Sequence, residues 1–299
     1  MTLNEATSYS LIKELERKKR TIMLELLEQL FRKVRAYMQS ERFDRYLVYS
    51  QSTEHTTMQF DREAEDIIIS GLIESGQNFE IFTEERPTFS TSNEPFYRII
   101  IDPVDGSTNV ARGIPTAGVS LAVLSTDEPI TPQNVQWALV GELYSGTVYQ
   151  AQRDLGAFCN GHRCQVSETS QLEQCLAGMN FDGRNPEVFR NLLTENPPIH
   201  NIRRSGSSSM DIVYVANGAY DAYIDTGDIL TAESFLAPLC IVLEAGGIVT
   251  DQHGKPLRPI SNLTEGYSLV VAGTEELHTE LLARIKTCLL YTSPSPRDS

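Results

Sequence analysis

The stretch DPVDGSTN, which begins at Asp102, directly follows the apolar run YRIII over residues 97–101. The apolar run predicts a buried strand. Pro103 fixes the backbone and lacks an N–H, and Gly106 allows an unusual turn. Asp102 and Asp105 can therefore converge on one point. A chain that leaves its core in this way either exposes two acids to water or holds a cation between them.

Converging carboxylates repel each other unless a cation lies between them, and Mg²⁺ prefers such hard oxygen ligands. Ser107 and Thr108 follow at the expected first turn of a helix, where backbone N–H groups can hold an anion. A metal ion beside an anion-binding turn is suited to phosphoryl chemistry. Asp-Pro and Asp-Gly are also common turn dipeptides, so the octapeptide alone fits a solvated turn equally well.

Other acids could face the same point. Glu84 and Glu85 end a short predicted strand, with Glu84 18 positions before Asp102, although adjacent acids on a loop are mostly solvated. Asp61 precedes a predicted helix that Gly76 would end, and an N-cap is its simplest role. These residues gain functional weight only if the fold brings them to the acids of DPVDGSTN.

Two glycine-containing stretches lie further along the chain. RRSGSSSMD, over residues 203–211, fits either a ligand-facing helix N-terminus or an ordinary capped helix start. EAGG, over residues 244–247, has glycines that would end a helix and allow close packing, which is a structural role. The sequence contains no HxxxH, HExxH, GxSxG or P-loop motif, which argues against a zinc site, a serine hydrolase and a P-loop NTPase.

Hydrophobic periodicity predicts an N-terminal half of sheet and helices joined to a C-terminal α/β half. A long amphipathic helix is predicted over residues 9–38. Strands are predicted at residues 81–82, 97–101, 117–125, 135–144, 147–152, 175–181, 220–224, 247–251 and 267–272, and helices at 186–194, 207–217, 232–245 and 274–288. No linker divides the chain, so we expect one catalytic unit over residues 1–288, with halves of about 1–155 and 156–288.

Bulk composition excludes several classes of protein. The net charge of −15 argues against a general nucleic-acid binder. No apolar run reaches the ~18 residues of a membrane span, and no signal-peptide pattern is present. Five cysteines without a CxxC motif suggest reduced thiols in a cytoplasm. Residues 289–299 resemble a translated cloning adapter and are expected to be a non-native, disordered tail.

Together these stretches resemble the inositol monophosphatase family, the Mg²⁺-dependent, lithium-sensitive phosphatases. DPVDGSTN is similar to the family signature DP(I/V/L)DGTTN, and the resemblance covers about residues 10–285. Further similar stretches are QFDREAED (59–66), FTEE (82–85), GAFCNGHRCQVS (156–167), RSGSSSMD (204–211), GAYDAYID (218–225) and EAGGIVTD (244–251). The resemblance implies a layered α-β-α-β-α sandwich and a homodimer.

The resemblance also implies a set of metal ligands. Glu84, Asp102 and the backbone carbonyl of Val104 would hold a first Mg²⁺ ion. Asp102 and Asp105 would hold a second. The expected cofactor is therefore Mg²⁺.

Contacts to the substrate are implied in the same way. Gly106 and Ser107 would bind phosphate through their backbone N–H groups. The Ser107 hydroxyl, oriented by Asp61, would help Glu84 to activate water; the family usually has threonine at this position. Residues that would lie against the alcohol part of the substrate are Gly206, Ser207 and Asp225.

One departure from the family pattern affects the second metal site. The family has a metal-binding Asp ten residues before the Glu of EAGG, and counting back from Glu244 gives Ser234. Glu233 is adjacent, but a helix turns ~100° per residue, so its side chain is expected to point elsewhere. Asp228, on the preceding loop, could substitute. The second metal ion is therefore expected to bind more weakly or through water.

The resemblance implies hydrolysis of a small phosphorylated alcohol, inositol monophosphate first, by metal-activated water without a phosphoenzyme. Related alternatives are a sugar-bisphosphate, histidinol-phosphate or nucleotide 3′-phosphatase. An alternative of another class is an attenuated or inactive homologue that binds a phosphorylated ligand or a protein partner. Ser234 is the residue that favours this last alternative.

Overall fold

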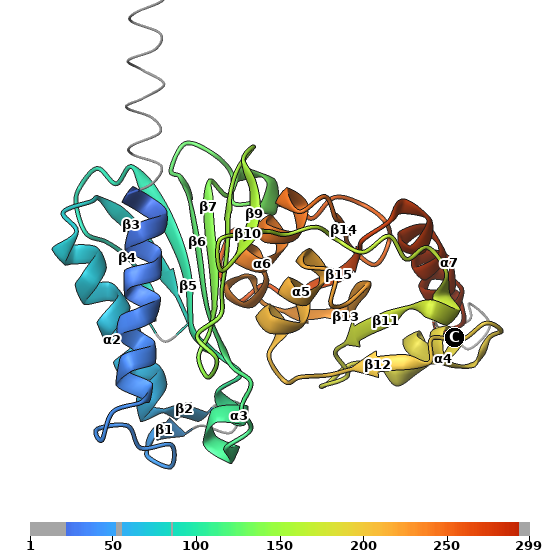
Figure 1. Cartoon of the computed structure of the whole chain (residues 1–299), viewed down its shortest axis with the longest axis horizontal. Coiled ribbons are helices and arrows are strands. Elements are labelled where there is room, and N and C mark those ends of the chain that lie inside the picture. Colours follow the sequence, from blue (N-terminus) through green and yellow to red (C-terminus); the bar gives the residue numbers. More distant parts are fainter. Residues whose placement is uncertain (1–21, 52–55, 85, 293–299) are drawn as a thin grey trace, which may run out of the picture.

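Two β-sheets alternate with layers of helices through the molecule (Figure 1). The computed structural model describes residues 22–51, 56–84 and 86–292. Helix 22–38 and α2 (Gln59–Glu74) cover the outer face of the larger sheet. Helices α5 (Ser208–Ala216) and α6 (Ala232–Glu244) lie between the sheets, and α7 (Glu275–Thr292) covers the smaller one. The predicted α-β-α-β-α sandwich is confirmed.

The larger sheet has the strand order β10-β9-β8-β7-β6-β5-β3-β4. Its strands are β3 (Phe79–Thr83), β4 (Arg86–Ser90), β5 (Tyr97–Asp105), β6 (Gly118–Ser125), β7 (Trp137–Glu142), β8 (Val148–Gln152), β9 (Gly156–Cys159) and β10 (His162–Arg163). Neighbouring strands run antiparallel except β3 and β5, which are parallel. Because of that parallel pair, Thr83 lies level with Ile101, and the chain leaves both strands at the same edge.

The smaller sheet has the order β12-β11-β13-β15-β14. Its strands are β11 (Leu176–Met179), β12 (Asn201–Arg203), β13 (Ala222–Leu230), β14 (Ile248–Thr250) and β15 (Tyr267–Ala272). The remaining elements are the hairpin β1 (Val48–Gln51) and β2 (Thr56–Met58), the short helices α3 (Ser107–Arg112) and α4 (Arg190–Thr194), and the 3₁₀ turns η1 (Pro132–Asn134), η2 (Leu172–Gln174) and η3 (Pro186–Phe189).

Three apolar cores hold the layers together. The largest fills the space around α5 and α6, whose side chains are almost all buried. The second lies under helix 22–38 and α2, and the third under α4 and α7. Each fully buried Leu, Ile or Phe contributes roughly 1.5–3 kcal/mol. The two inner helices are thus fixed between the sheets, where they can position polar groups precisely.

Two predicted helices near the N-terminus compare differently with the structure. Of the helix predicted over residues 9–38, residues 9–21 lie outside the described part, and 22–38 are helical. Helix α2 begins at Gln59, so Asp61 is its third residue and not its N-cap. The Asp61 carboxylate accepts a hydrogen bond from the backbone N–H of Met58 at 3.0 Å, which caps the helix from inside its first turn.

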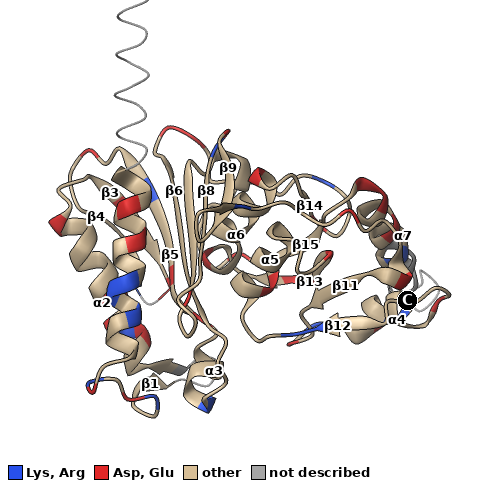
Figure 2. Cartoon of the chain, viewed as in Figure 1, with Lys and Arg blue, Asp and Glu red and all other residues tan. Residues whose placement is uncertain are grey.

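Lys and Arg lie in separate short segments, which include parts of helix 22–38, α3 and β12 (Figure 2). The cysteines at 159, 164, 175 and 240 are free thiols. Among the described residues, no helix has both the length and the apolar composition that crossing a membrane requires. The predicted tail over 289–299 lies partly in α7, and residues 293–299 are outside the described range.

Helix 22–38 depends on a glycine in the sheet beneath it. Phe31 is fully buried, and a Cβ added to Gly141 on β7 would overlap its ring. We predict that Gly141→Ala lowers the free energy of unfolding by about 1–3 kcal/mol through overpacking. Urea denaturation at 25 °C measures this loss.

The control is a double-mutant cycle with Phe31→Ala, which alone removes a buried ring. The overlap disappears in that background, so the two losses should fail to add by about 0.5–3 kcal/mol. Additive losses would show that Phe31 does not limit position 141.

Candidate functional site

The two acids of DPVDGSTN lie on β5 across a β-bulge. Asp102 pairs with Ser120 on β6, whereas Asp105 pairs with Gly118, so three steps on β5 match two on β6. Residues three apart point to opposite faces of a regular strand, but one extra residue returns them to the same face. Pro103, which cannot donate to the ladder, lies within the bulge. The predicted convergence of Asp102 and Asp105 therefore arises from an irregular strand rather than from a turn after the strand.

Asp105 is held by the start of α5. Its Oδ2 accepts hydrogen bonds from Ser207 Oγ and from the backbone N–H of Ser209, both at 2.6 Å. Burial raises the pKa of Asp105, and these donors oppose that shift. RRSGSSSMD is therefore more than a capped helix start, because it binds an acid of the first motif across the interface between the two halves.

The pKa of Asp102 is raised both by burial and by neighbouring acids. Burial raises its pKa well above the usual value, and the charges of Glu84, Asp105 and Glu233 raise it further. Ser234 Oγ donates a hydrogen bond to Asp102 Oδ2 at 3.1 Å and partly opposes the shift. Glu84, whose side chain is exposed, is thus close enough to act on Asp102.

Ser107 links α2 to the first motif. Its Oγ lies 2.7 Å from Asp61 Oδ1 and 2.9 Å from the carbonyl oxygen of Val104. The hydroxyl has a single proton, which it can donate to only one of these oxygens at full strength. The carboxylate oxygen of Asp61 is closer and, being charged, is the stronger acceptor. Asp61 is buried and accepts a hydrogen bond from the backbone of Met58, so its carboxylate is held in place as an acceptor for the Ser107 hydroxyl.

Sequence reasoning missed Asn109, the last residue of DPVDGSTN. Its Nδ2 donates to the carbonyl oxygens of Thr116 and Ser205, both at 2.8 Å. A Cβ on Gly206 would collide with the Asn109 amide. Asn109 therefore fixes the turn at Gly206 against DPVDGSTN. Its position inside this signature could have indicated that it has a role in the site.

Glu65 was also missed, because it lies within an ordinary helical pattern. It is fully buried and its Oε1 accepts a hydrogen bond from Thr83 Oγ1 at 2.7 Å. Thr83 is the last residue of β3, immediately before Glu84. Glu65 thus fixes the point where the chain leaves β3 for Glu84.

The three residues considered for the second metal site, at positions 228, 233 and 234, have different environments. Ser234 lies at the expected position but contributes a hydrogen bond instead of a charge. Asp228 Oδ1 accepts a hydrogen bond from Ser268 on β15 at 2.7 Å, so its carboxylate is already engaged there. Glu233, expected to point in another direction than residue 234, is buried. Its charge raises the pKa of Asp102, and the charge of Asp105 raises the pKa of Glu233.

The place of Glu233 at the start of α6 brings it near β5. Glu233 is the second residue of α6, and side chains of a helix tilt toward its N-terminus. That end of α6 faces β5, because Ser120 Oγ donates to the backbone carbonyl of Glu233 at 3.0 Å and Ser120 pairs with Asp102. The backbone of Glu233 therefore lies beside the strand that carries Asp102.

A cavity of about 230 Å³ adjoins the acids. Its lining residues are Asn180, Asp182, Arg184, Arg204, Gly206, Ser207, Ser208, Asp211, Ile229, Leu230 and Thr231. Gly206 and Ser207, which were predicted to lie against the alcohol part of the substrate, line this cavity. Asp225 does not: it is fully buried, and Arg184 donates to both of its oxygens at 2.8 Å. Arg184, rather than Asp225, reaches the cavity.

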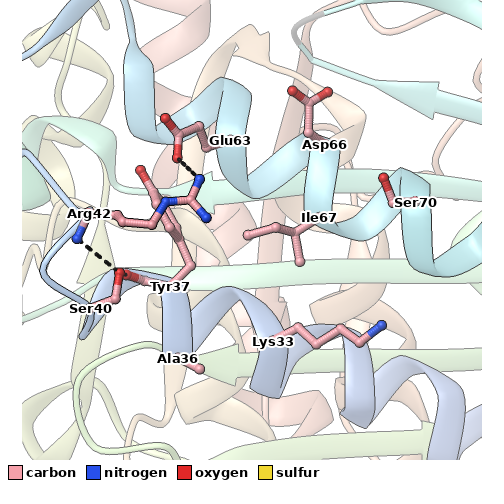
Figure 3. Close-up of a pocket in the computed structure, with 9 residues that line it drawn as sticks. All are labelled: Lys33, Ala36, Tyr37, Ser40, Arg42, Glu63, Asp66, Ile67 and Ser70. Carbon is pink, nitrogen blue, oxygen red and sulfur yellow. Dashed lines mark hydrogen bonds and ion pairs between the residues drawn. The ribbon is translucent and has the colours of Figure 1, made fainter.

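A larger hollow of about 590 Å³ lies between helix 22–38 and α2 (Figure 3). Its polar groups contact one another: Arg42 lies 3.7 Å from Glu63, and its backbone N–H donates to Ser40 Oγ. The predicted acids of the site do not line it. Size alone would therefore select the wrong hollow.

The acids fit a divalent cation in part. Among the described residues, Asp102 Oδ1 and Glu233 Oε2 are buried carboxylate oxygens without a hydrogen-bond partner. Hard, anionic, unpartnered oxygens are suitable ligands for Mg²⁺. No group of three His, Cys, Asp or Glu side chains that could hold a metal ion occurs in the described range. Carbonyl, water or phosphate oxygens would have to complete the coordination.

Comparisons with known proteins show the family of the chain. The sequence profile of the inositol monophosphatase family matches residues 11–290. A fructose-1,6-bisphosphatase/inositol-1-monophosphatase of Methanothermobacter thermautotrophicus is 32% identical over 236 residues, which cover 77% of this chain and 83% of the relative. An inositol-1-monophosphatase of Mesorhizobium japonicum is 33% identical over 235 residues, with coverages of 76% and 82%.

A solved structure gives the same result at the level of fold. The extragenic suppressor protein suhB from Bartonella henselae superposes with a TM-score of 0.73 at 26% identity. The match covers 89% of this chain and 97% of that one. The likeness thus extends over both sheets and includes the interface at which the acids lie.

Asp211, which lines the cavity, should make stability depend on pH. Burial raises its pKa to about 6, against the backbone N–H of Ser205, which lowers it. The folded protein then holds this proton more tightly than the unfolded chain does. The resulting stability is complete below about pH 4 and is lost as the pH rises through about 6.

We predict that Asp211→Asn removes a fall of up to about 3 kcal/mol in the free energy of unfolding between pH 4 and pH 7. Urea denaturation across this range in EDTA measures it. The control is Asp127→Asn, which changes an exposed carboxylate. Parallel pH profiles of wild type and Asp211→Asn would disprove the assignment.

Proposed function

Because this chain belongs to the inositol monophosphatase family, we propose that it is a Mg²⁺-dependent phosphatase of a small phosphorylated alcohol, with inositol monophosphate as the first candidate. The reaction class is that of the family, hydrolysis of a phosphoric monoester. One observation carries the proposal for the site: Asp61, Ser107, Asp102 and Asp105 meet at the edge where β5 leaves the sheet.

Ser107 is proposed to position the attacking water. Its proton is directed at Asp61, so the oxygen retains lone pairs that can accept a hydrogen bond from water. Glu84, exposed at the end of β3, is the general base in this proposal. When bound, Mg²⁺ would neutralise phosphate charge and lower the pKa of water.

The cavity beside Ser207 is proposed to receive the alcohol. Its volume of about 230 Å³ is smaller than the pockets of about 300–1,000 Å³ that bind drug-sized ligands, so it suits a smaller molecule. Ser207 lies at its wall and is hydrogen-bonded to Asp105, which links the alcohol side to the acids. Arg184, held by the buried Asp225, and Arg204 supply donors for hydroxyl groups.

Residues 1–288 are proposed to act as one catalytic unit, because the acids of β5 are hydrogen-bonded to Ser207 and Ser234 of the C-terminal half. A homodimer is proposed from the family alone. A cytoplasmic location rests on the free cysteines. The acidic charge and the dispersed basic segments in Figure 2 support a protein without nucleic-acid partners.

We predict that Ser107→Ala lowers kcat for inositol 1-phosphate by about 10²–10⁴-fold, because water loses its oriented acceptor. Ser107→Thr keeps the hydroxyl and should retain most of the activity. Phosphate release at saturating Mg²⁺ measures both variants. Equal activity of Ser107→Ala and wild type would remove Ser107 from the mechanism.

Substrate choice requires a panel of inositol 1-phosphate, fructose 1,6-bisphosphate, histidinol phosphate and a nucleoside 3′-phosphate at varied Mg²⁺. We expect turnover that disappears in EDTA, with inositol 1-phosphate giving the highest kcat/KM. A higher value for another ester would reassign the substrate within the family. Absence of turnover on every ester, with retained binding, would favour the inactive homologue that Ser234 suggests.

A further inference from the structure

We infer that Glu233 supplies the acidic metal ligand that position 234 lacks, so that a divalent cation is held between the carboxylates of Asp102 and Glu233. The inference rests on the proposed function, because the cation is the cofactor of the same site. It concerns only which residue of this chain binds that cation.

Burial and hydrogen bonding single out Glu233. Its residue is only 5% exposed, and Thr231 Oγ1 donates to Oε1 while Oε2 has no partner among the described residues. A buried carboxylate oxygen without a donor is costly, because it has lost its water without replacement. An oxygen kept in that condition is explained if a cation occupies its vicinity in the functional protein.

Asp102 shows the complementary arrangement. It is 2% exposed, Ser234 donates to Oδ2, and Oδ1 has no partner among the described residues. Each of the two carboxylates therefore uses one oxygen for a hydroxyl and leaves the other unpartnered. Ser234 donates its hydrogen bond to Oδ2 of Asp102, so Oδ1 stays available to a cation.

A side-chain hydrogen bond and a strand pairing hold the helix start that carries Glu233 beside the strand that carries Asp102. Ser120 pairs with Asp102 across β5 and β6, and the same Ser120 donates its hydroxyl to the backbone carbonyl of Glu233 at 3.0 Å. The start of α6 is thus attached to the strand pair at the level of Asp102. Two protein carboxylates are sufficient for Mg²⁺, which usually keeps several water ligands and often binds only one or two carboxylates.

Asp228 is the competing acid, and the structure disfavours it. Its Oδ1 accepts from Ser268 Oγ at 2.7 Å, and its backbone N–H donates back to the same oxygen at 2.9 Å. Asp228 lies in β13, not on a loop as the sequence suggested, and is hydrogen-bonded to the neighbouring strand β15. It would have to break this reciprocal pair of hydrogen bonds to reach Asp102.

The test compares Glu233→Gln, Asp228→Asn and Glu276→Gln, the last an exposed acid on α7 that controls for net charge. Metal-stripped protein is titrated with Mn²⁺ by electron paramagnetic resonance and with Mg²⁺ by calorimetry. We expect Glu233→Gln to weaken metal binding at one site by at least about tenfold. Loss of a residue that only supports a metal ligand typically lowers metal affinity by about 10–100-fold, and loss of a ligand itself should cost at least as much. The two controls should bind as wild type does.

Thermal unfolding supplies a second readout that a purely structural role would not produce. In EDTA, Glu233→Gln should unfold at or above the wild-type temperature, because a buried charge facing Asp102 has been removed. With saturating Mg²⁺ the wild type should gain more than the variant, so their order reverses. The double variant Glu233→Gln, Ser234→Asp should recover metal affinity, because the carboxylate returns to the neighbouring position.

Unchanged metal affinity in Glu233→Gln would overturn the inference, even if phosphate release still requires Mg²⁺. Weakened affinity in Asp228→Asn alone would overturn it in favour of Asp228. Glu233-dependent binding without turnover of any ester would uphold the inference and refute the proposed phosphatase. The two proposals therefore fail by different measurements.

Discussion

The β-bulge at Pro103 is the constraint from which the site follows. Without it, Asp105 would point to the face opposite Asp102, into the core under helix 22–38. With it, both carboxylates face the inner layer, where α5 and α6 present their first turns. Proline enforces this irregularity because it cannot complete the ladder. A single residue without an N–H therefore determines which side of the sheet carries the chemistry.

The buried acids also join the two halves of the chain. Asp105 is bound by Ser207 and Ser209, and Asp102 by Ser234, so each acid of the N-terminal sheet takes its hydroxyl donors from the C-terminal half. Buried carboxylates need such donors, and the donors need the acids to be fixed. Site geometry and interface geometry are consequently one arrangement, and a change in either is transmitted to the other.

Local sequence patterns predicted most of this fold because its inner elements are strongly periodic or uniformly apolar. The strands around residues 97–152 and the helices α5 to α7 were identified for that reason. Strands β1, β2, β4, β9, β10 and β12 were missed. Of these, β1 is exposed throughout and β4 and β12 are mostly exposed, which leaves little hydrophobic signal. The contacts of Asn109 and Glu65 depend on which segments meet, and no single-segment pattern contains that information.

The replacement at position 234 illustrates how charge and stability trade against each other at such a site. Every additional carboxylate near Asp102 raises the cost of folding without metal, since buried like charges repel. A serine at 234 lowers that cost and donates a hydrogen bond to one oxygen of Asp102, while Glu233 still provides a carboxyl group at the same level of the sheet. Without metal, the site therefore contains fewer carboxylates close to one another than it would if position 234 were also an acid. Cation affinity then depends on Glu233, whose side chain is longer than that of aspartate and lies near the start of α6. For this reason a metal ligand can lie one residue away from its expected position.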